Sequence, residues 1–386
     1  MKQKIFQKLS LFLLITAVLC AIPSKAAGDA LAVDLQETIS QSLTSCAAYH
    51  GEALTPTNET PDALPCSPAT ANEQLLIPGG IPFGVKFNTD GVLVVGFCDV
   101  ETNKGKINPA YTAGLRTGDI IHRLNDRPIT DAASLSQAMD EGKGQPFTVT
   151  FTRENSEYTV TVTPVYSTSD EKYKSGIWIR DSGAGIGTVT FIDPASGMFG
   201  GLGHGICDSD TGKLIPLDRG TVIDVTISGI VRGLPGTPGE VKGYFNSEKL
   251  GSVFGNTDCG VFGLFSKIPT VCEKAIPTAS RGEVHEGKAE ILCSLDTDAV
   301  THYDVTISAI NPTAKSNKCF TVTVTDPDLI AKTGGIVQGM SGSPILQDGK
   351  LIGAVTHVLV NDPTTGYGIF IENMLNAANI PLAKAS

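Results

Sequence analysis

The chain has 386 residues, of which 42 are Gly, 22 are Pro and 18% are charged, and its formal net charge is −11 at pH 7. This length accommodates about two or three domains, and the many short Val, Ile and Thr runs between Gly-rich turns favour β-sheets over helical bundles. We expect no nucleic-acid partner, because binding phosphates needs a concentrated basic face and the sequence contains none.

The first segment, residues 1–27, has the pattern of a signal peptide. Three lysines within its first eight residues precede an apolar run from about Leu9 to Ile22, and the small-residue sequence Ser24-Lys25-Ala26 follows. Such a run is short for a bilayer span and fits a secretory segment with a cleavage site. We therefore expect export. Whether the segment is removed or kept as a membrane anchor stays open.

Residues 28–75 are rich in Ala, Thr, Pro and Ser and contain little strand periodicity, which predicts a mostly extended linker. Such a linker is a natural place for proteolytic cutting.

Residues 76–166 predict one compact unit. Asp131 is a plausible N-cap for a helix that carries Ala132, Leu135 and Met139 on one apolar stripe. Before this helix, the pattern A-G-L-x-x-G-D-I-I-x-x-L-N-x-x-x-I runs from Ala113 to Ile129. The order of these elements resembles a bacterial PDZ domain.

This resemblance implies a groove between a strand edge and the helix, where an extended peptide adds by main-chain hydrogen bonding. It also implies a loop whose backbone N–H groups hold a terminal carboxylate. In this sequence the loop would be Pro82-Phe83-Gly84-Val85.

From residue 174 to residue 386, strand-like runs alternate with turns. About ten strands in roughly two hundred residues suit a closed or two-barrel β-fold, because closure removes exposed strand edges. The predicted fold class is therefore mainly β.

The most informative motif is G-M-S-G-S-P, from Gly339 to Pro344, ahead of an alternating apolar strand. A serine in a glycine turn can present its hydroxyl, while neighbouring N–H groups point at a reacting carbonyl oxygen. Ser341 is the candidate nucleophile. The candidate oxyanion donors are the N–H groups of Gly339 and Ser341.

A serine nucleophile needs a base and a group that orients the base. Of the six histidines, His204 alone lies in a comparably glycine-rich loop, so we take it as the candidate base. Asp326, at the end of a β run, is the first choice for the orienting carboxylate. Asp258 is the alternative, and His357 is interpreted as a packing or pocket residue.

The sequence predicts no cofactor and no metal site. Its glycines fall in no phosphate-binding pattern, and its cysteines form no C-x-x-C pair. Eight of the nine cysteines lie outside the N-terminal segment, and sequence alone assigns no pairing among them.

His204 in G-H-G-I, Asp326 in T-D-P and Ser341 in G-G-I-V-Q-G-M-S-G-S-P-I resemble the SpoIVB-type peptidases of endospore-forming bacteria. The resemblance implies a PDZ domain followed by a trypsin-like double-barrel peptidase at residues 174–386, with the triad His204, Asp326 and Ser341. It also implies secretion from the forespore into the space between two membranes.

The resemblance further implies self-cleavage near the N-terminus and then cutting of a membrane-bound regulator. That cut releases an intramembrane metalloprotease, which processes a sigma factor precursor. The PDZ domain would bind either the target or the enzyme's own N-terminal segment.

Two other interpretations stay open at this point. One is a noncatalytic extracytoplasmic PDZ scaffold with a peptidase-like domain. The other is a transmembrane sensor that keeps its N-terminal segment.

Overall fold

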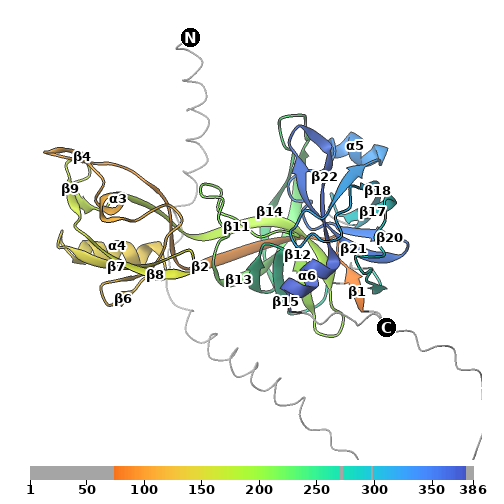
Figure 1. Ribbon diagram of the computed structural model, residues 1–386, viewed down its shortest axis with the longest axis horizontal. Coiled ribbons are helices and arrows are strands. Elements are labelled where there is room, and N and C mark those ends of the chain that lie inside the picture. The colour runs from red at the N-terminus through yellow and green to blue at the C-terminus, as the bar shows by residue number, and fades with distance from the viewer. Residues whose placement is uncertain (1–73, 270–272, 297–298, 380–386) are drawn as a thin grey trace, which may run out of the picture. The chain divides into compact units, whose positions relative to one another are not determined.

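The computed structural model describes residues 74–269, 273–296 and 299–379, and it consists mainly of β-strands (Figure 1). The strands form two closed barrels and a smaller sheet that carries helices. This confirms the predicted mainly β fold with a double barrel. The predicted export segment and most of the linker, including its cutting sites, lie outside the described residues. Among the helices that the structure describes, none has the length and apolar character needed to cross a bilayer.

The first barrel closes because β2 pairs with β11 along one edge and with β13 along the other. Its buried centre is aromatic: the ring of Phe199 lies 5.5 Å from that of Phe83 and 4.6 Å from that of Phe265. The strands in order around the barrel are β2 (Pro82–Phe97), β11 (Ile177–Ile192), β12 (Met198–Gly201), β15 (Gly260–Phe265), β14 (Glu240–Thr257) and β13 (Leu217–Val231). Two short strands, β1 (Leu75–Pro78) and β16 (Ile276–Pro277), extend the sheet beside β11.

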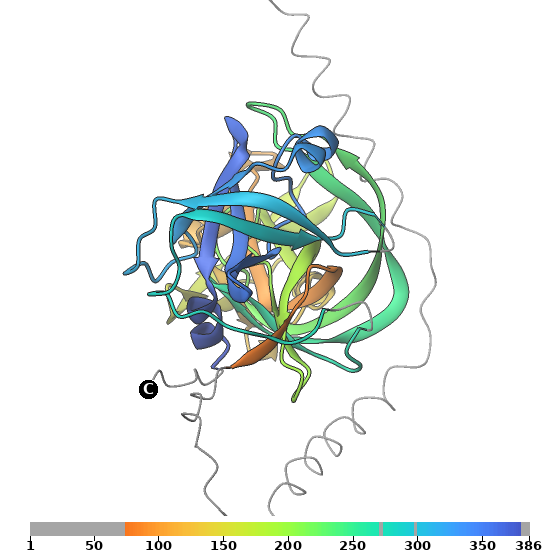
Figure 2. The ribbon, with the colours of Figure 1, turned by 90° about the vertical axis from the view of Figure 1, so that its right-hand side faces the viewer.

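The second barrel is coloured teal to blue in Figure 2. Its strands in order are β17 (Gly287–Cys293), β18 (Thr301–Ser308), β19 (Phe320–Val324), β22 (Asp362–Phe370), β21 (Lys350–Leu359) and β20 (Pro344–Gln347). Helix α5 (Pro327–Thr333) follows β19, and helix α6 (Ile371–Ala377) follows β22. Alternating Val and Ile side chains of these strands fill the barrel, as their period of two requires.

The smaller sheet has the predicted PDZ-like elements. Asp131 caps α4 (Ala132–Glu141) as expected, because its carboxylate accepts the Ser134 N–H at 2.7 Å, and Leu135 faces the core. The main strands are β5 (Ile120–Leu124), β7 (Phe147–Arg153) and β8 (Ser156–Val162). The other elements are β3 (Val100–Thr102), β4 (Gly105–Ile107), α3 (Pro109–Ala113), β6 (Arg127–Pro128), β9 (Val165–Ser167) and β10 (Lys172–Lys174).

Strands β2 and β11 belong to the first barrel and to the PDZ-like sheet at once. The end of β2, Leu93–Phe97, pairs with Ile177–Arg180 of β11, and Val92 and Leu93 also pair with β5. The beginning of β2, Pro82–Phe87, pairs with β11 and β13 in the barrel. The two units therefore interleave along the chain and share two strands.

A buried ion pair stabilises the PDZ-like sheet. The Asp119 carboxylate is fully buried, and it accepts hydrogen bonds from the Arg153 guanidinium at 2.7 Å and from the Arg116 N–H at 2.8 Å. Removing one partner of a buried pair leaves the other charge uncompensated.

We therefore expect Asp119→Ala to lower the free energy of unfolding by about 2–3 kcal/mol, allowing for the partial exposure of Arg153. Asp126→Ala is the control, because that carboxylate is exposed and lies 3.9 Å from Arg123. Its effect should stay below about 0.5 kcal/mol. Urea unfolding measures both, and equal effects would contradict the assigned role of Asp119.

Candidate active site

Ser341 lies in a tight turn directly before β20, as the sequence predicts. Gly339 and Gly342 on either side of it have φ angles of 98° and 95°, a conformation that favours glycine. The Ser341 hydroxyl donates a hydrogen bond to the carbonyl of Thr356 on β21 at 2.8 Å. Ser341 is only partly buried and lines a cleft, so a reacting group can approach it.

Strand β11 of the first barrel holds this turn in place. The Thr188 N–H donates to the Ser341 carbonyl at 3.0 Å, and the Thr188 hydroxyl donates to the Gly339 carbonyl at 2.8 Å. The buried Thr190 hydroxyl donates to the Gly342 carbonyl at 2.8 Å. Sequence reasoning missed both threonines, because a Thr in an alternating strand carries no signal of such a role.

The two predicted oxyanion donors lie in peptide units whose orientation is fixed. The carbonyl ahead of Gly339 accepts from the Val241 N–H at 2.8 Å, and the carbonyl ahead of Ser341 accepts from the Ser343 N–H at 3.0 Å. In a trans peptide the N–H points opposite to the preceding carbonyl. Within the described part of the chain, neither N–H donates to another residue. Both are available to a developing oxyanion.

His204 lies in the loop after β12, and the backbone bends sharply just before it, as its glycines predict. Leu202 and Gly203 have φ angles of 66° and 65°. Nδ1 of His204 lies 2.8 Å from the Gly205 carbonyl oxygen. Because a carbonyl only accepts, this contact places the proton on Nδ1 and leaves Nε2 as a proton acceptor.

Ser341, His204 and His357 converge on one cleft of about 640 Å³. The rings of His204 and His357 lie 4.9 Å apart, centre to centre. The Ser341 hydroxyl bonds to the carbonyl of Thr356, the residue that precedes His357. His357 is thus a pocket residue, as predicted, and the candidate nucleophile and base face the same space.

Both imidazoles are favoured in their neutral form. Burial lowers the pKa of His204 below its ordinary value of 6.5, although the Gly205 carbonyl opposes this. Burial, together with the nearby His204 and Lys318, lowers the pKa of His357 to about 4. A neutral His204 is the form that can accept the proton of a serine hydroxyl.

The pH dependence of peptidase activity should reflect the lowered pKa of His204. Only neutral His204 can act as the base, so kcat/KM rises as pH increases through its pKa. Because that pKa is lowered, we expect the acidic half-maximum below pH 6.5. A pH profile of kcat/KM on a peptide substrate measures it, with His122→Gln in the PDZ-like sheet as a variant that leaves the profile in place. A midpoint above pH 7 would contradict the environment described for His204.

The structure does not bring Asp326 to His204, which corrects the predicted triad. Its carboxylate caps α5, accepting the N–H groups of Asp328 and Leu329 at 2.9 Å and of Asp304 at 3.3 Å. In the second barrel Thr321 is in register with Tyr367, and Tyr367 with His357. Asp326 lies five residues beyond Thr321, roughly 15 Å along the chain.

The alternative carboxylate, Asp258, lies beside the loop that carries His204, because a Cβ atom on Gly205 would be 2.7 Å from the carbonyl oxygen of Thr257, the residue before Asp258. Among the described residues, no hydrogen bond joins Asp258 to the imidazole, so its role as the orienting carboxylate stays a prediction. Asp258 is exposed at the turn between β14 and β15, and its charge helps to raise the pKa of the Cys207 and Cys259 thiols, after burial as the larger cause. The Gly205 carbonyl oxygen lies at Nδ1 of His204, where an orienting aspartate was expected.

Two substitutions separate a capping role from a catalytic role for Asp326. Asn keeps the accepting side-chain oxygen, so we expect Asp326→Asn to preserve both turnover and stability. Asp326→Ala removes the cap and should lower the free energy of unfolding by about 1 kcal/mol. If folded Asp326→Asn instead lost turnover by about 10⁴-fold, the effect of removing a triad carboxylate, the aspartate would orient His204.

The predicted carboxylate-binding loop, Pro82-Phe83-Gly84-Val85, is also corrected. These residues form the start of β2, and their backbone pairs with β11 and β13. Phe83 and Val85 are buried in the first barrel. The backbone groups that would hold a peptide carboxylate are therefore engaged in the barrel.

The start of β11 is the edge of the PDZ-like sheet beside α4. Ile177–Arg180 pairs with β2 on one side, and among the described strands none pairs with its other side. The Asp181 carboxylate accepts the Ala132 N–H at the start of α4 at 2.9 Å. A strand edge next to a helix is the arrangement in which an extended peptide adds to a PDZ domain. No sequence signal distinguished this segment from the other strands.

Comparisons with known families match both units. The family model described as SpoIVB peptidase S55 matches residues 171–375, which is more than half of the chain. The PDZ domain model matches residues 79–163. None of the curated proteins compared with the chain matches it significantly.

Solved structures overlap with parts of the chain. The Rv3671c protease of M. tuberculosis in its active form is 14% identical over 53% of this chain and 77% of its own, with a TM-score of 0.31. The PDZ domain of an SdrC-like protein from Listeria monocytogenes is 16% identical over 23% of this chain and 87% of its own, with a TM-score of 0.20. We assign no residue role from overlaps of this size.

Proposed function

The chain belongs to the SpoIVB peptidase S55 family, and from this premise we propose that it is a regulatory endopeptidase that acts outside the cytoplasm and cuts itself before it cuts a partner. It is a serine peptidase with a PDZ domain. The observation that carries the proposed chemistry is the convergence of Ser341 and His204 on one cleft within the matched region.

In the proposed mechanism, the Ser341 hydroxyl turns from the Thr356 carbonyl towards His204 and attacks a peptide carbonyl carbon. Nε2 of His204 takes the hydroxyl proton as the carbon–oxygen bond forms. The oxyanion accepts the N–H groups of Gly339 and Ser341. The peptide C–N bond then breaks, and His204 returns the proton to the leaving amine.

Water completes the reaction. It attacks the acyl group on Ser341 while His204 takes a proton from it, and the regenerated Ser341 hydroxyl receives that proton. The Gly205 carbonyl stabilises the imidazolium in both halves, because it accepts the Nδ1 proton throughout. This backbone carbonyl replaces the carboxylate of a triad.

We assign the regulatory steps by the family. The proposed substrates are the chain's own N-terminal segment and a membrane-bound regulator of an intramembrane protease, whose release leads to processing of a sigma factor precursor. The proposed place of action is the space between the forespore and mother-cell membranes. Support comes from the signal-like residues 1–27, from the peptidase family and from the PDZ domain, a module that binds extended peptides.

Self-cleavage is testable with a catalytically inactive copy of the chain as the substrate. Purified wild type should cut an excess of the Ser341→Ala chain within residues 28–73 when the two are mixed, and Ser341→Ala alone should stay intact. Mass spectrometry of the new termini measures the cuts. Peptide binding without any turnover, at all enzyme concentrations, would instead favour a noncatalytic PDZ scaffold.

A further inference from the structure

The cleft that holds Ser341 and His204 is uncharged. Among the described residues that line it there is no Asp, Glu, Lys or Arg. Its side walls are apolar and come from both barrels. The aliphatic residues that line the cleft include Ile186, Ile206, Ile336, Val337, Val358 and Val360.

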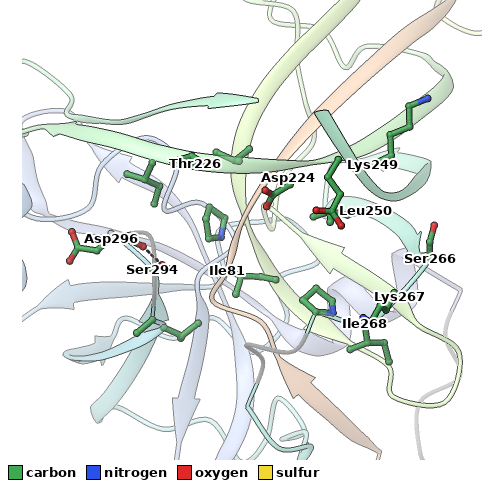
Figure 3. Close-up of a pocket in the computed structure, with 17 residues that line it drawn as sticks. Ile81, Asp224, Thr226, Lys249, Leu250, Ser266, Lys267, Ile268, Ser294 and Asp296 are labelled. Carbon is green, nitrogen blue, oxygen red and sulfur yellow. Dashed lines mark hydrogen bonds between the residues drawn. The ribbon is translucent and has the colours of Figure 1, made fainter. Parts of the chain in front are cut away.

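Other cavities of the protein are lined by charged residues. A second cavity, of about 410 Å³, has Asp224, Lys249, Lys267 and Asp296 among the side chains that line it (Figure 3). The absence of charged lining residues is therefore a property of the catalytic cleft and not of every cavity. The two imidazoles add none to the catalytic cleft at neutral pH, because burial lowers both of their pKa values.

The wall beside the nucleophile is closed by an aliphatic side chain. A Cβ atom on Gly366 would lie 2.7 Å from Cδ1 of Ile336, so the Ile336 side chain fills the space that the missing side chain leaves. Gly366 is in register with Val358, which lines the cleft. Ile336 and Val358 thus lie close together and line the cleft with hydrocarbon.

A charged side chain that entered this cleft would lose hydration and meet no Asp, Glu, Lys or Arg among the residues that line it, which is unfavourable. An apolar side chain would gain from burial against the same walls. The volume is that of a cavity that takes a ligand of several residues. We propose that the enzyme selects uncharged, apolar stretches of polypeptide at the scissile bond and rejects Lys, Arg, Asp and Glu there.

This inference rests on the proposed peptidase function and specifies its substrate class. It makes a prediction about the chain itself. Within residues 28–73 the two longest runs without Asp, Glu, Lys or Arg are residues 38–51 and residues 63–72. Self-cleavage should fall in these runs and avoid the charged positions between them.

The test is digestion of a peptide library of known sequences by wild type, with Ser341→Ala as the blank. We expect substrates with an uncharged, apolar residue at the cut to exceed those with Lys, Arg, Asp or Glu there on the order of a hundredfold in kcat/KM. No cleavage above the blank would reject the proposed function itself. Cleavage that depends on Ser341 and occurs next to charged residues would reject only the specificity.

Introducing a charge among the residues that line the cleft should make the enzyme accept substrate side chains of the opposite charge. Val358→Asp should raise cleavage next to Lys and Arg at least tenfold, and Val358→Lys should do the same for Asp and Glu. Val360→Asp at the exposed rim is the second variant if Val358→Asp does not fold. Leu264→Asp, on an exposed site of β15 away from the cleft, is the control and should keep the wild-type preference. An unchanged preference in the folded Val358 variants would overturn the assignment of this wall.

Discussion

Replacing Ser341 with Ala is expected to lower kcat by at least about 10⁴-fold, the scale of loss when the nucleophile of a serine peptidase is removed. The variant lacks the only atom that can form the acyl bond, whereas the cleft, the oxyanion N–H groups and His204 remain. The fold should persist, because the lost hydroxyl makes one hydrogen bond, to the Thr356 carbonyl. Turnover of a fluorogenic peptide and self-cleavage on gels measure the effect.

Two comparisons complete this experiment. His204→Ala should reduce kcat by a similar factor, since nucleophile and base act as one unit and their losses do not add. Ser308→Ala, half-buried on β18 of the same barrel, makes the same chemical change away from the cleft and should retain activity. Undiminished self-processing by pure Ser341→Ala would refute the mechanism.

Replacing Gly342 with Ala should damage both activity and stability. A Cβ atom there would lie 2.1 Å from the Thr188 carbonyl oxygen and 2.4 Å from the Leu202 nitrogen, both backbone atoms. The residue also has a φ of 95°, which an L side chain rarely adopts. The serine turn must move away from β11, so the oxyanion donors and the nucleophile lose their alignment. We expect a loss of more than about 3 kcal/mol in the free energy of unfolding and a loss of turnover of at least about a hundredfold.

Gly349 provides the matched control for this prediction. Its φ of 76° is also left-handed, but a Cβ atom there meets nothing within 4 Å. Gly349→Ala should therefore show only the cost of the backbone conformation, about 1 kcal/mol, and full activity. Denaturant unfolding and peptide turnover separate the two variants. If both glycines tolerated alanine equally, the close approach of β11 to the serine turn would not be a constraint on the enzyme.

The parts of the site that sequence predicted are those encoded by neighbouring residues. The glycines around Ser341 and His204 indicate bent backbones, and both bends are present. Asp131 was predicted as a helix cap from its position and is one. These inferences succeed because turn and cap preferences act within a few residues.

The parts that sequence missed depend on contacts between distant segments. Asp326 ends a strand and precedes a proline, a position equally typical of a helix cap, and the structure gives it that role. Pro82–Val85 has the local pattern of a PDZ loop, but its apolar alternation also suits a barrel strand, and pairing with β11 and β13 decides between them. Thr188 holds the serine turn through Gly339, which is 151 residues away, and no local pattern can indicate such a contact.

Strand β2 belongs to the first barrel as well as to the PDZ-like sheet. The peptidase therefore cannot be isolated by trimming the chain from its N-terminus. A chain that began at residue 171 would leave that barrel open between β11 and β13. Excision of the PDZ-like unit would have to be internal, joining the end of β2 to the start of β11 by a short turn. Such a chain keeps the barrel parts of β2 and β11. In this form the catalytic cleft could be studied without the PDZ-like sheet.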